Sequence, residues 1–397
     1  MGIQNYGVEY GTSYASMTAL TNVQSVSITL GRQEQLTQYS SSTAQISLRY
    51  PTGYASPIAD LVAGNFVAIT NISTGSLLFR GVINNVIARY GIPFEGGVGN
   101  ADFLDISVES SFAQLGRMQG NGYTMTSSNL SSQMLEMETE TDVVPILQGT
   151  NFATSMPLST ITGTWADWLN RVALTFNARL IDSNGQALTL RTPFYNVASS
   201  FNLSDTTNNA TNQVYDAINF ESFADNYYTQ VKVSPEGLSP VVVTKSGATK
   251  PFRTLDINTL NATTGQADDY ANYLLGNYET PKVSISSVSC SAESQAVFKL
   301  DQEPFLGGSI GCQISVAFRG TSYPCIIEGV SVTATPAGSR YTFYLSGADL
   351  NAYLLLDSTV FGILGGTGII YNTPMDYNEL GYIYNDDYAD NGNRLGY

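Results

Sequence analysis

The sequence reads Gly64-Asn65-Phe66-Val67-Ala68-Ile69 in its first quarter and Gly311-Cys312-Gln313-Ile314-Ser315-Val316 in its last quarter. Each stretch begins with a glycine and ends with a small residue between two β-branched ones. Each is followed by a second apolar run that a glycine interrupts, Leu77–Val82 and Cys325–Val330. A strand, a turn and a strand with a glycine at one register point indicate a small bulged β-unit. The repetition predicts two similar β-barrels near the two ends of the chain.

The composition favours a β-rich protein with a sizeable core. Of the 397 residues, 43% are hydrophobic and 13% charged, and there are 25 Tyr and 36 Gly. Aromatic and β-branched residues suit strands, whereas Gly, Asn and Ser suit turns. No apolar run approaches the roughly 18 residues that a membrane-spanning helix needs. Because no basic region followed by an apolar one opens the chain, we expect no signal peptide.

The charge and the lack of histidine exclude several classes of function. A net charge of −16, with 17 basic residues spread thinly, argues against a protein that neutralises DNA phosphates. With no histidine, the chain has neither a Ser-His-Asp nor a Cys-His pair and no imidazole ligand for a metal. We therefore expect no enzyme, no cofactor and no metal site. The odd set of Cys290, Cys312 and Cys325 predicts reduced, buried thiols.

The patterns along the chain predict a mainly β fold with small α+β insertions, in which two similar small β-barrels flank inserted middle domains. The segments are an N-terminal arm (1–22), a first β-barrel (23–118), a loop or extension (119–160), a small α+β domain (161–200), a second inserted α+β domain (201–282), a second β-barrel (283–350) and an extended Tyr/Asn/Gly-rich C-terminal tail (351–397).

Three helices are expected in the middle of the chain. Thr164 and Asp167 are spaced almost as in a capping box, and apolar residues then recur at helical spacing up to Phe176. A helix over 266–275 is expected to stop at Gly276. A short helix near 131–138 is the one element expected within 119–160.

Several stretches have the residue types of catalytic or ligand sites, and each has a simpler explanation. Gly307–Gly311 fits a nucleophile elbow around Ser309, but no histidine is present to take the proton, so we expect a turn that enters a strand. Gly362–Gly368 lacks the Lys-Ser/Thr of a phosphate loop and reads as a flexible turn. Trp165 and Trp168 have the spacing of a core-facing helix and are expected in the core rather than on sugars.

Acidic residues give three further candidates. Glu136, Glu138, Glu140 and Asp142 could pair as carboxylates for glycoside cleavage, although a solvated loop explains them equally well. Asp182–Gly185 and Asn385–Asp387 contain calcium-type ligands without a complete binding loop. A hairpin turn and a solvated tail are the simpler interpretations of these two stretches.

The C-terminal tail is the best candidate for an interface. Tyrosine supplies a large contact area at low entropic cost and keeps a polar tip, so a tail rich in it could lie against a neighbouring subunit. The alternative is a disordered tail. The interface candidates are Tyr371, Tyr377, Tyr382, Tyr384, Tyr388 and Tyr397.

The order of the predicted elements resembles the baseplate hub or tail-tip hub (minor tail) proteins of long-tailed bacteriophages. The resemblance rests on Pro57–Arg80, on the Trp-bearing helix before the D-x-N-G hairpin, on the helix Asp268–Leu275 and on the ending Leu356–Leu364. It covers most of the chain from Val23 to Leu364 as a set of short motifs. The long tail and the Ser-rich segment 119–160 depart from the family pattern, which leaves their partners open.

The resemblance implies a homotrimer in which each subunit contributes two tail-tube-like barrels to a ring of six. This symmetry adaptor would join the six-fold tail tube or distal tail ring to a three-fold tip and would line the DNA channel. The implied partners are the other two subunits, the tail tube or distal tail protein, the tape measure protein and tip or fibre proteins. The implied location is the virion tail tip, after assembly in the host cytoplasm. The acidic balance fits a channel through which DNA slides without specific binding.

Two other classes of function stay open at the level of the sequence. A receptor-binding or adhesin-like tail protein would hold host glycans with surface aromatics in 119–160 or 365–397 and would have no central pore. A carboxylate-dependent glycosidase would depend on the acidic run Glu136–Asp142 alone.

Overall fold

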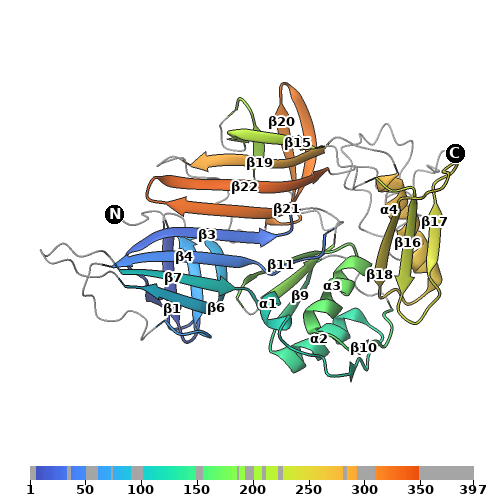
Figure 1. Cartoon of the computed structure of the whole chain (residues 1–397), viewed down its shortest axis with the longest axis horizontal. Helices are drawn as coiled ribbons and strands as arrows, with labels where there is room; N and C mark the ends of the chain where they lie inside the picture. Colours follow the sequence, from blue (N-terminus) through green and yellow to red (C-terminus); the bar gives the residue numbers. More distant parts are fainter. Residues whose placement is uncertain are drawn as a thin grey trace, which may run out of the picture.

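The fold is mainly β, with a few short helices (Figure 1). The computed structural model describes residues 6–33, 37–50, 61–72, 75–90, 102–148, 155–185, 187–192, 201–207, 212–221, 227–279, 284–292 and 309–347.

Eight antiparallel strands form one continuous sheet across the molecule (Figure 1). In spatial order they are β15 (Ala217–Glu221), β19 (Ser284–Ala292), β22 (Gly338–Gly347), β21 (Thr321–Thr335), β3 (Val23–Gly31), β4 (Thr43–Tyr50), β7 (Asp102–Glu109) and β6 (Leu77–Arg89). Because β3 pairs with β21, the N-terminal and C-terminal strand sets are joined edge to edge. The described strands form no closed barrel, so two separate barrels are not what the described part of the chain contains.

Further strands extend the two halves of the sheet. β5 (Phe66–Asn71) pairs with the first half of β6, and β1 (Tyr6–Gly11) pairs with β5 and with β2 (Thr18–Ala19). In the second half, β20 (Gln313–Phe318) pairs with the first half of β21, and β13 (Asn202–Ser204) lies between β20 and β14 (Asn212–Val214). The segment expected to be an N-terminal arm is therefore corrected to a pair of strands, because the apolar side chains of Tyr6 and Val8 are buried in the core.

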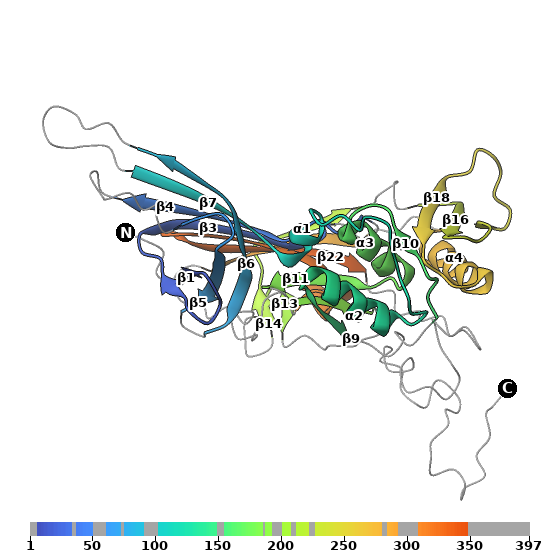
Figure 2. The same cartoon turned by 90° about the horizontal axis from the view of Figure 1, so that it is seen from below.

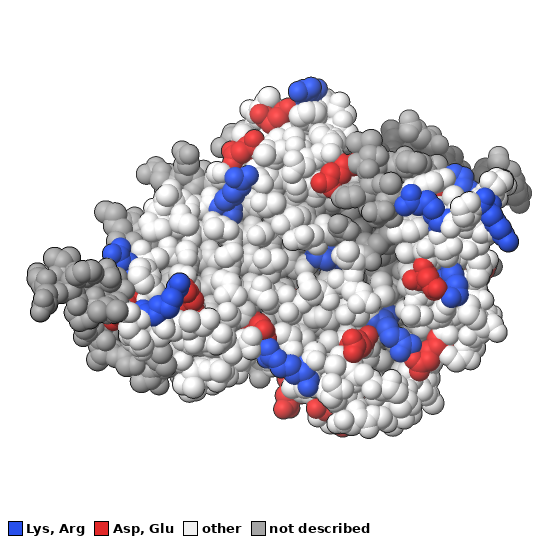
Figure 3. Space-filling view, viewed as in Figure 1, with Lys and Arg blue, Asp and Glu red and all other residues white. Residues whose placement is uncertain are grey.

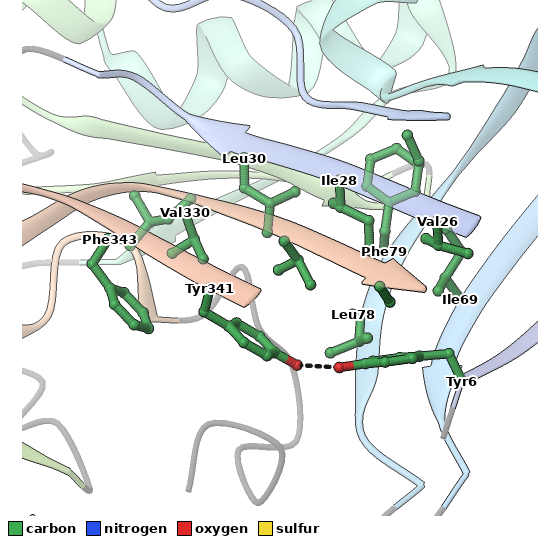
Figure 4. Packing of buried hydrophobic residues seen from close by; sticks show 14 of the residues in the cluster. Tyr6, Val26, Ile28, Leu30, Ile69, Leu78, Phe79, Val330, Tyr341 and Phe343 are labelled. Carbon is green, nitrogen blue, oxygen red and sulfur yellow. Dashed lines mark hydrogen bonds between the residues drawn. The ribbon is translucent and has the colours of Figure 1, made fainter. Parts of the chain in front are cut away.

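A single hydrophobic core lies under both halves of the sheet. The alternation of β3 buries Val26, Ile28 and Leu30 and leaves Ser and Thr on the other face. Figure 4 shows these residues beside Val330 and Phe343 of the second half. The hydroxyl oxygens of Tyr6 and Tyr341 lie 2.8 Å apart in this core. Figure 2 shows β1 and β5 on the core side of the sheet, where they cover it.

A second unit contains helices packed on a small sheet. It comprises α1 (Ser111–Leu115), α2 (Leu130–Thr141), α3 (Trp165–Thr175), β9 (Val144–Gln148), β11 (Arg179–Asn184) and β12 (Ala187–Arg191), with β8 (Tyr123–Thr124) paired to β10 (Thr160–Ile161). The capping box of Thr164 and Asp167 is confirmed. The segment 119–160 is not a long loop: α2 runs beyond the short helix expected there, and Met134 and Met137 pack in one core with the α3 residues.

A third unit packs one helix on a three-stranded sheet. β16 (Gln230–Pro235) lies between β17 (Val241–Thr244) and β18 (Thr254–Thr259), and α4 (Thr264–Tyr278) covers this sheet. Two expectations are wrong here. Gly276 does not end the helix, because Tyr278 is still within it and is buried against Tyr228. The segment 201–282 was expected to form one inserted domain, but its strand at 217–221 belongs to the large sheet, where it pairs with β19.

Candidate assembly interface

Two copies of the same five-strand unit make up most of the large sheet. The first copy has the spatial order β3–β4–β7–β6–β5 and the second has the order β15–β19–β22–β21–β20. In both copies the chain passes through the strands in the same order and every pairing is antiparallel. The repeat expected from Gly64 and Gly311 therefore exists as a repeat of topology.

The hydrogen bonds at the two initiating glycines match in detail. The Gly64 amide donates to the Ile83 carbonyl at 2.9 Å, and the Gly311 amide donates to the Ile327 carbonyl at 2.7 Å. Ile83 and Ile327 donate in return to the residue after each glycine, at 2.8 and 3.0 Å. Both glycines have a positive φ, +97° and +82°. The register against the next strand shifts directly after each isoleucine, so Asn84 and Glu328 are equivalent bulge residues.

The second glycine of the sequence repeat is not equivalent in the two copies. Counted from the bulges, Gly329 corresponds to Asn85, whereas Gly81 corresponds to Cys325. Each position requires glycine because of a different neighbour. A Cβ on Gly329 would clash with the carbonyl oxygen of Arg32, and a Cβ on Gly81 would clash with the carbonyl oxygen of Glu109. The alignment of these two glycines that the sequence suggested is therefore wrong.

The two copies meet where the second half of β21 pairs with β3. Gly329 lies opposite Gly31, Val332 opposite Ile28 and Ala334 opposite Val26. All six residues of these pairs are inaccessible or nearly so, which makes this junction part of the core. Strand pairing and apolar burial therefore hold one copy against the next within a single chain.

A buried charge cluster lies at one end of this junction. Glu328 accepts hydrogen bonds from Arg32 Nε at 2.9 Å, from an Arg179 guanidinium nitrogen at 2.8 Å and from Ser346 Oγ at 2.6 Å. The ring of Tyr39 lies 4.7 Å from the Arg32 guanidinium carbon. Burial alone would raise the pKa of Glu328, but the charges of Arg179 and Arg32 outweigh it and lower the pKa to about 2. The cluster ties β3, β21 and β11 together.

A buried carboxylate fixes the helical unit against the first strand copy. Asp182 accepts hydrogen bonds from the Ser42 amide at 2.9 Å, from Ser42 Oγ at 2.5 Å and from Ser110 Oγ. Burial raises the pKa of Asp182, while the hydrogen bonds from these serines oppose the rise. Asp182 is thus a structural residue on β11 rather than a calcium ligand in an exposed turn.

The first copy has a cluster at the same positions, but it is exposed. Asn84 Nδ2 donates to Glu109 Oε1 at 2.7 Å, and Arg117 binds both Asn84 Oδ1, at 3.0 Å, and the Glu109 carboxylate. Glu109 and Ser346 occupy equivalent positions in the two copies, because each is paired with the residue that lies two positions before the bulge residue of the neighbouring strand. The Arg117 side chain is 57% exposed, whereas that of Arg179 is 2% exposed. No described strand occupies, next to β6, the place that β3 has next to β21.

The face of the large sheet opposite the core is polar and carries balanced charges. Its hydroxyl residues include Ser25, Ser27, Thr29, Ser47, Ser107, Ser287, Ser291, Ser331, Thr333 and Thr342. Its charged residues are Arg49, Arg89, Arg340, Asp105, Glu109 and Glu221, three of each sign. Figure 3 shows the same face largely free of charge. The net charge of −16 is therefore not concentrated on this surface.

The other sequence candidates take structural positions or lie outside the described residues. Trp165 and Trp168 are each 3% exposed, as expected for core residues, and the three cysteines are buried thiols. Ser309 is buried just before β20, in the turn that Gly311 completes. Gly362–Gly368, Asn385–Asp387 and the six tail tyrosines lie outside the described residues.

Most of the acidic run lies on a helix and not on a solvated loop. It lies on and just after α2, where a spacing of two residues points neighbouring side chains in different directions. Glu136 accepts hydrogen bonds from the Thr126 and Ser127 amides at 2.9 and 3.0 Å. The small burial of Glu136 would raise its pKa, but these hydrogen bonds lower it. Within the described ranges, no group of three or more Cys, Asp or Glu residues is placed to hold a metal ion. None of the described helices has the length and apolar character needed to cross a membrane.

Comparison with solved structures shows what this arrangement is similar to. The 43 kDa tail protein of prophage MuSo2 from Shewanella oneidensis superimposes with a TM-score of 0.59 at 13% identity, over 87% of this chain and 98% of the other. The chain has the fold of a prophage tail protein. A tail protein from Neisseria meningitidis MC58 gives a TM-score of 0.60 at 11% identity, over 87% and 97% of the two chains.

Prophage tail protein gp18 from Listeria monocytogenes EGD-e gives a TM-score of 0.50 at 11% identity, over 87% and 96%. No protein-family model and no curated protein matches the sequence. The tail-protein fold thus spans the two strand copies and the units between them, at an identity where sequence alone gives no match.

Proposed function

We propose that this chain is a structural bacteriophage tail protein: a trimeric hub that adapts a six-fold tail tube or distal tail ring to a three-fold tip. The observation that carries the proposal is the repeated five-strand unit, joined edge to edge through β3 and β21. Three chains that repeated this contact between neighbours would place six quasi-equivalent β-units around one axis. A six-fold partner could then meet the same surface six times.

The surface of the large sheet fits the wall of a DNA channel. A face of hydroxyl side chains and balanced charges has no cluster of cations that would bind the DNA phosphates. It also has no excess of negative charge that would strongly repel them. This replaces the sequence-based idea that an acidic lumen keeps DNA from adhering. The protein would act by assembly and not by catalysis, in the virion tail tip, with the tail tube or distal tail protein, the tape measure protein and tip or fibre proteins as neighbours.

The oligomeric state tests this proposal directly. The purified chain of 42.7 kDa is expected to give three times that mass in light scattering after size-exclusion chromatography. Electron micrographs of the same fraction are expected to show three subunits and six lobes around a hole. A chain that stays monomeric at micromolar concentration would overturn the proposal.

A further inference from the structure

The two end strands of the eight-strand row, β6 and β15, each have an edge with no strand beside it in the described part of the chain. β6 pairs with β7 along Val82–Arg89, but β5 follows its other edge only as far as Val82. β15 pairs with β19 alone. Large apolar side chains are exposed at both edges: Ile87 is 51% exposed, Tyr90 58% and Phe220 36%. Long open edges with apolar side chains are surfaces on which another strand pairs readily.

The internal repeat identifies what such edges bind. The matching bulges show that β6 in the first copy corresponds to β21 in the second. Following the strand pairings onward from these two strands shows that β3 in the first copy corresponds to β15 in the second, with Val26 at the position of Ile218. In the second copy, the edge of β21 beyond its bulge is occupied, and its occupant is β3. The two open edges are therefore the two sides of a contact that the chain already makes once within itself.

We infer that β6 of one subunit pairs antiparallel with β15 of the next, in the register of the β21–β3 junction. This inference rests on the proposed trimer and specifies its interface. Within the chain, Thr333 of β21 lies opposite Ser27 of β3. The same register between subunits places Arg89 opposite Asn219, Ala88 opposite Phe220 and Ile87 opposite Glu221. The contact is heterologous, and in a trimer it closes after three copies.

The side chains at the two edges complement one another in this register. On the core side, Ala88 and Ile218 pack only partly against the core, and the exposed Tyr90 and Phe220 would cover them. The corresponding residues at the junction within the chain, Ile28 and Val332, are completely buried.

Cysteine cross-linking tests the register. Opposite residues of an antiparallel pair have Cα atoms about 4.5–5.5 Å apart, within the range of a disulfide. The variant Ile87→Cys/Glu221→Cys places its cysteines opposite each other between subunits. The matched control Ile87→Cys/Ala217→Cys displaces one of them by four residues, about 13 Å along the strand. Within one chain the two edges lie at opposite ends of the sheet (Figure 1), and the native cysteines are buried.

After mild oxidation, we expect the in-register variant to give covalent dimers and trimers on a non-reducing gel, at least tenfold more than the control. Arg89→Cys/Asn219→Cys is a second in-register pair at exposed positions and is expected to behave in the same way. If light scattering shows a trimer but both in-register pairs cross-link no better than the control, this strand pairing is wrong while the hub proposal stands. A monomer under the same conditions would overturn both.

Discussion

Arg32 and Glu328 lie 296 positions apart in the sequence, and their side chains form a 2.9 Å salt bridge at the junction of the two strand copies. Their side chains are 4% and 0% exposed. Arg179 reaches the other carboxylate oxygen from β11, so one carboxylate holds three distant segments. Because desolvation offsets much of the Coulomb energy of a buried pair, we interpret the cluster as a device that fixes the geometry of the junction.

Replacing Glu328 by Gln should destabilise the chain strongly. The substitution removes one negative charge and leaves two guanidiniums buried beside each other, and breaking a buried pair in this way costs about 3–5 kcal/mol. The free energy of unfolding, measured by urea titration, should fall by that amount. Asp256→Asn is the matched control, because Asp256 pairs with Lys232 at the surface and such pairs contribute about 1 kcal/mol or less. Equal losses in the two variants would contradict the interpretation of the cluster.

Acid should weaken this junction over a defined range of pH. The pKa of Glu328 is lowered from 4.5 to about 2 in the folded chain. A lowered carboxylate pKa contributes stability that is complete above the unfolded value and is lost as the pH falls through the folded value. The difference in melting temperature between the natural chain and Glu328→Gln should therefore shrink between pH 4.5 and pH 2. A difference that does not change over this range would assign the effect of the substitution to packing.

Local sequence patterns mark parts of the first copy. The alternation of Val26, Ile28 and Leu30 is typical of a strand with one buried face, as β3 is, and the glycine-interrupted run Leu77–Val82 coincides with the first half of β6. The helix α2 was anticipated only in part, because its buried Leu and Met residues are separated by Ser, Thr and Glu. The extent of α4 was underestimated because packing of Tyr278 keeps the helix going beyond Gly276.

The site itself could not be found from the sequence. Arg32, Arg179 and Glu328 are far apart in the chain, and nothing local distinguishes them from surface charges. The repeat of glycines did indicate two copies, but the second glycine misled the alignment because each copy is crowded at a different point. Only the register of the strands identifies Asn84 as the counterpart of Glu328.

The two initiating glycines offer a matched test of the repeat. Gly311→Ala and Gly64→Ala both force a residue with a Cβ into a positive φ, which costs about 1–2 kcal/mol. A Cβ at position 311 would also lie 3.1 Å from Arg191 Cδ, whereas one at position 64 would meet no atom within 4 Å. Thermal unfolding should therefore show the larger loss for Gly311→Ala. A larger loss for Gly64→Ala would contradict the view that both substitutions destabilise the chain through the same backbone strain.

Lysines on the polar face of the large sheet should convert a passive channel into one that binds DNA. Ser27, Ser47 and Thr333 lie on this face, away from the core. The triple substitution by Lys should give a trimer that binds linear duplex DNA, with an affinity that falls as salt rises because each phosphate contact releases counterions. The natural chain should not bind. Fluorescence anisotropy over a salt series measures the effect, and a small closed circle of the same sequence is the control, because a ring can be threaded only onto DNA with a free end. Equal binding of linear and circular DNA would place this face outside the channel.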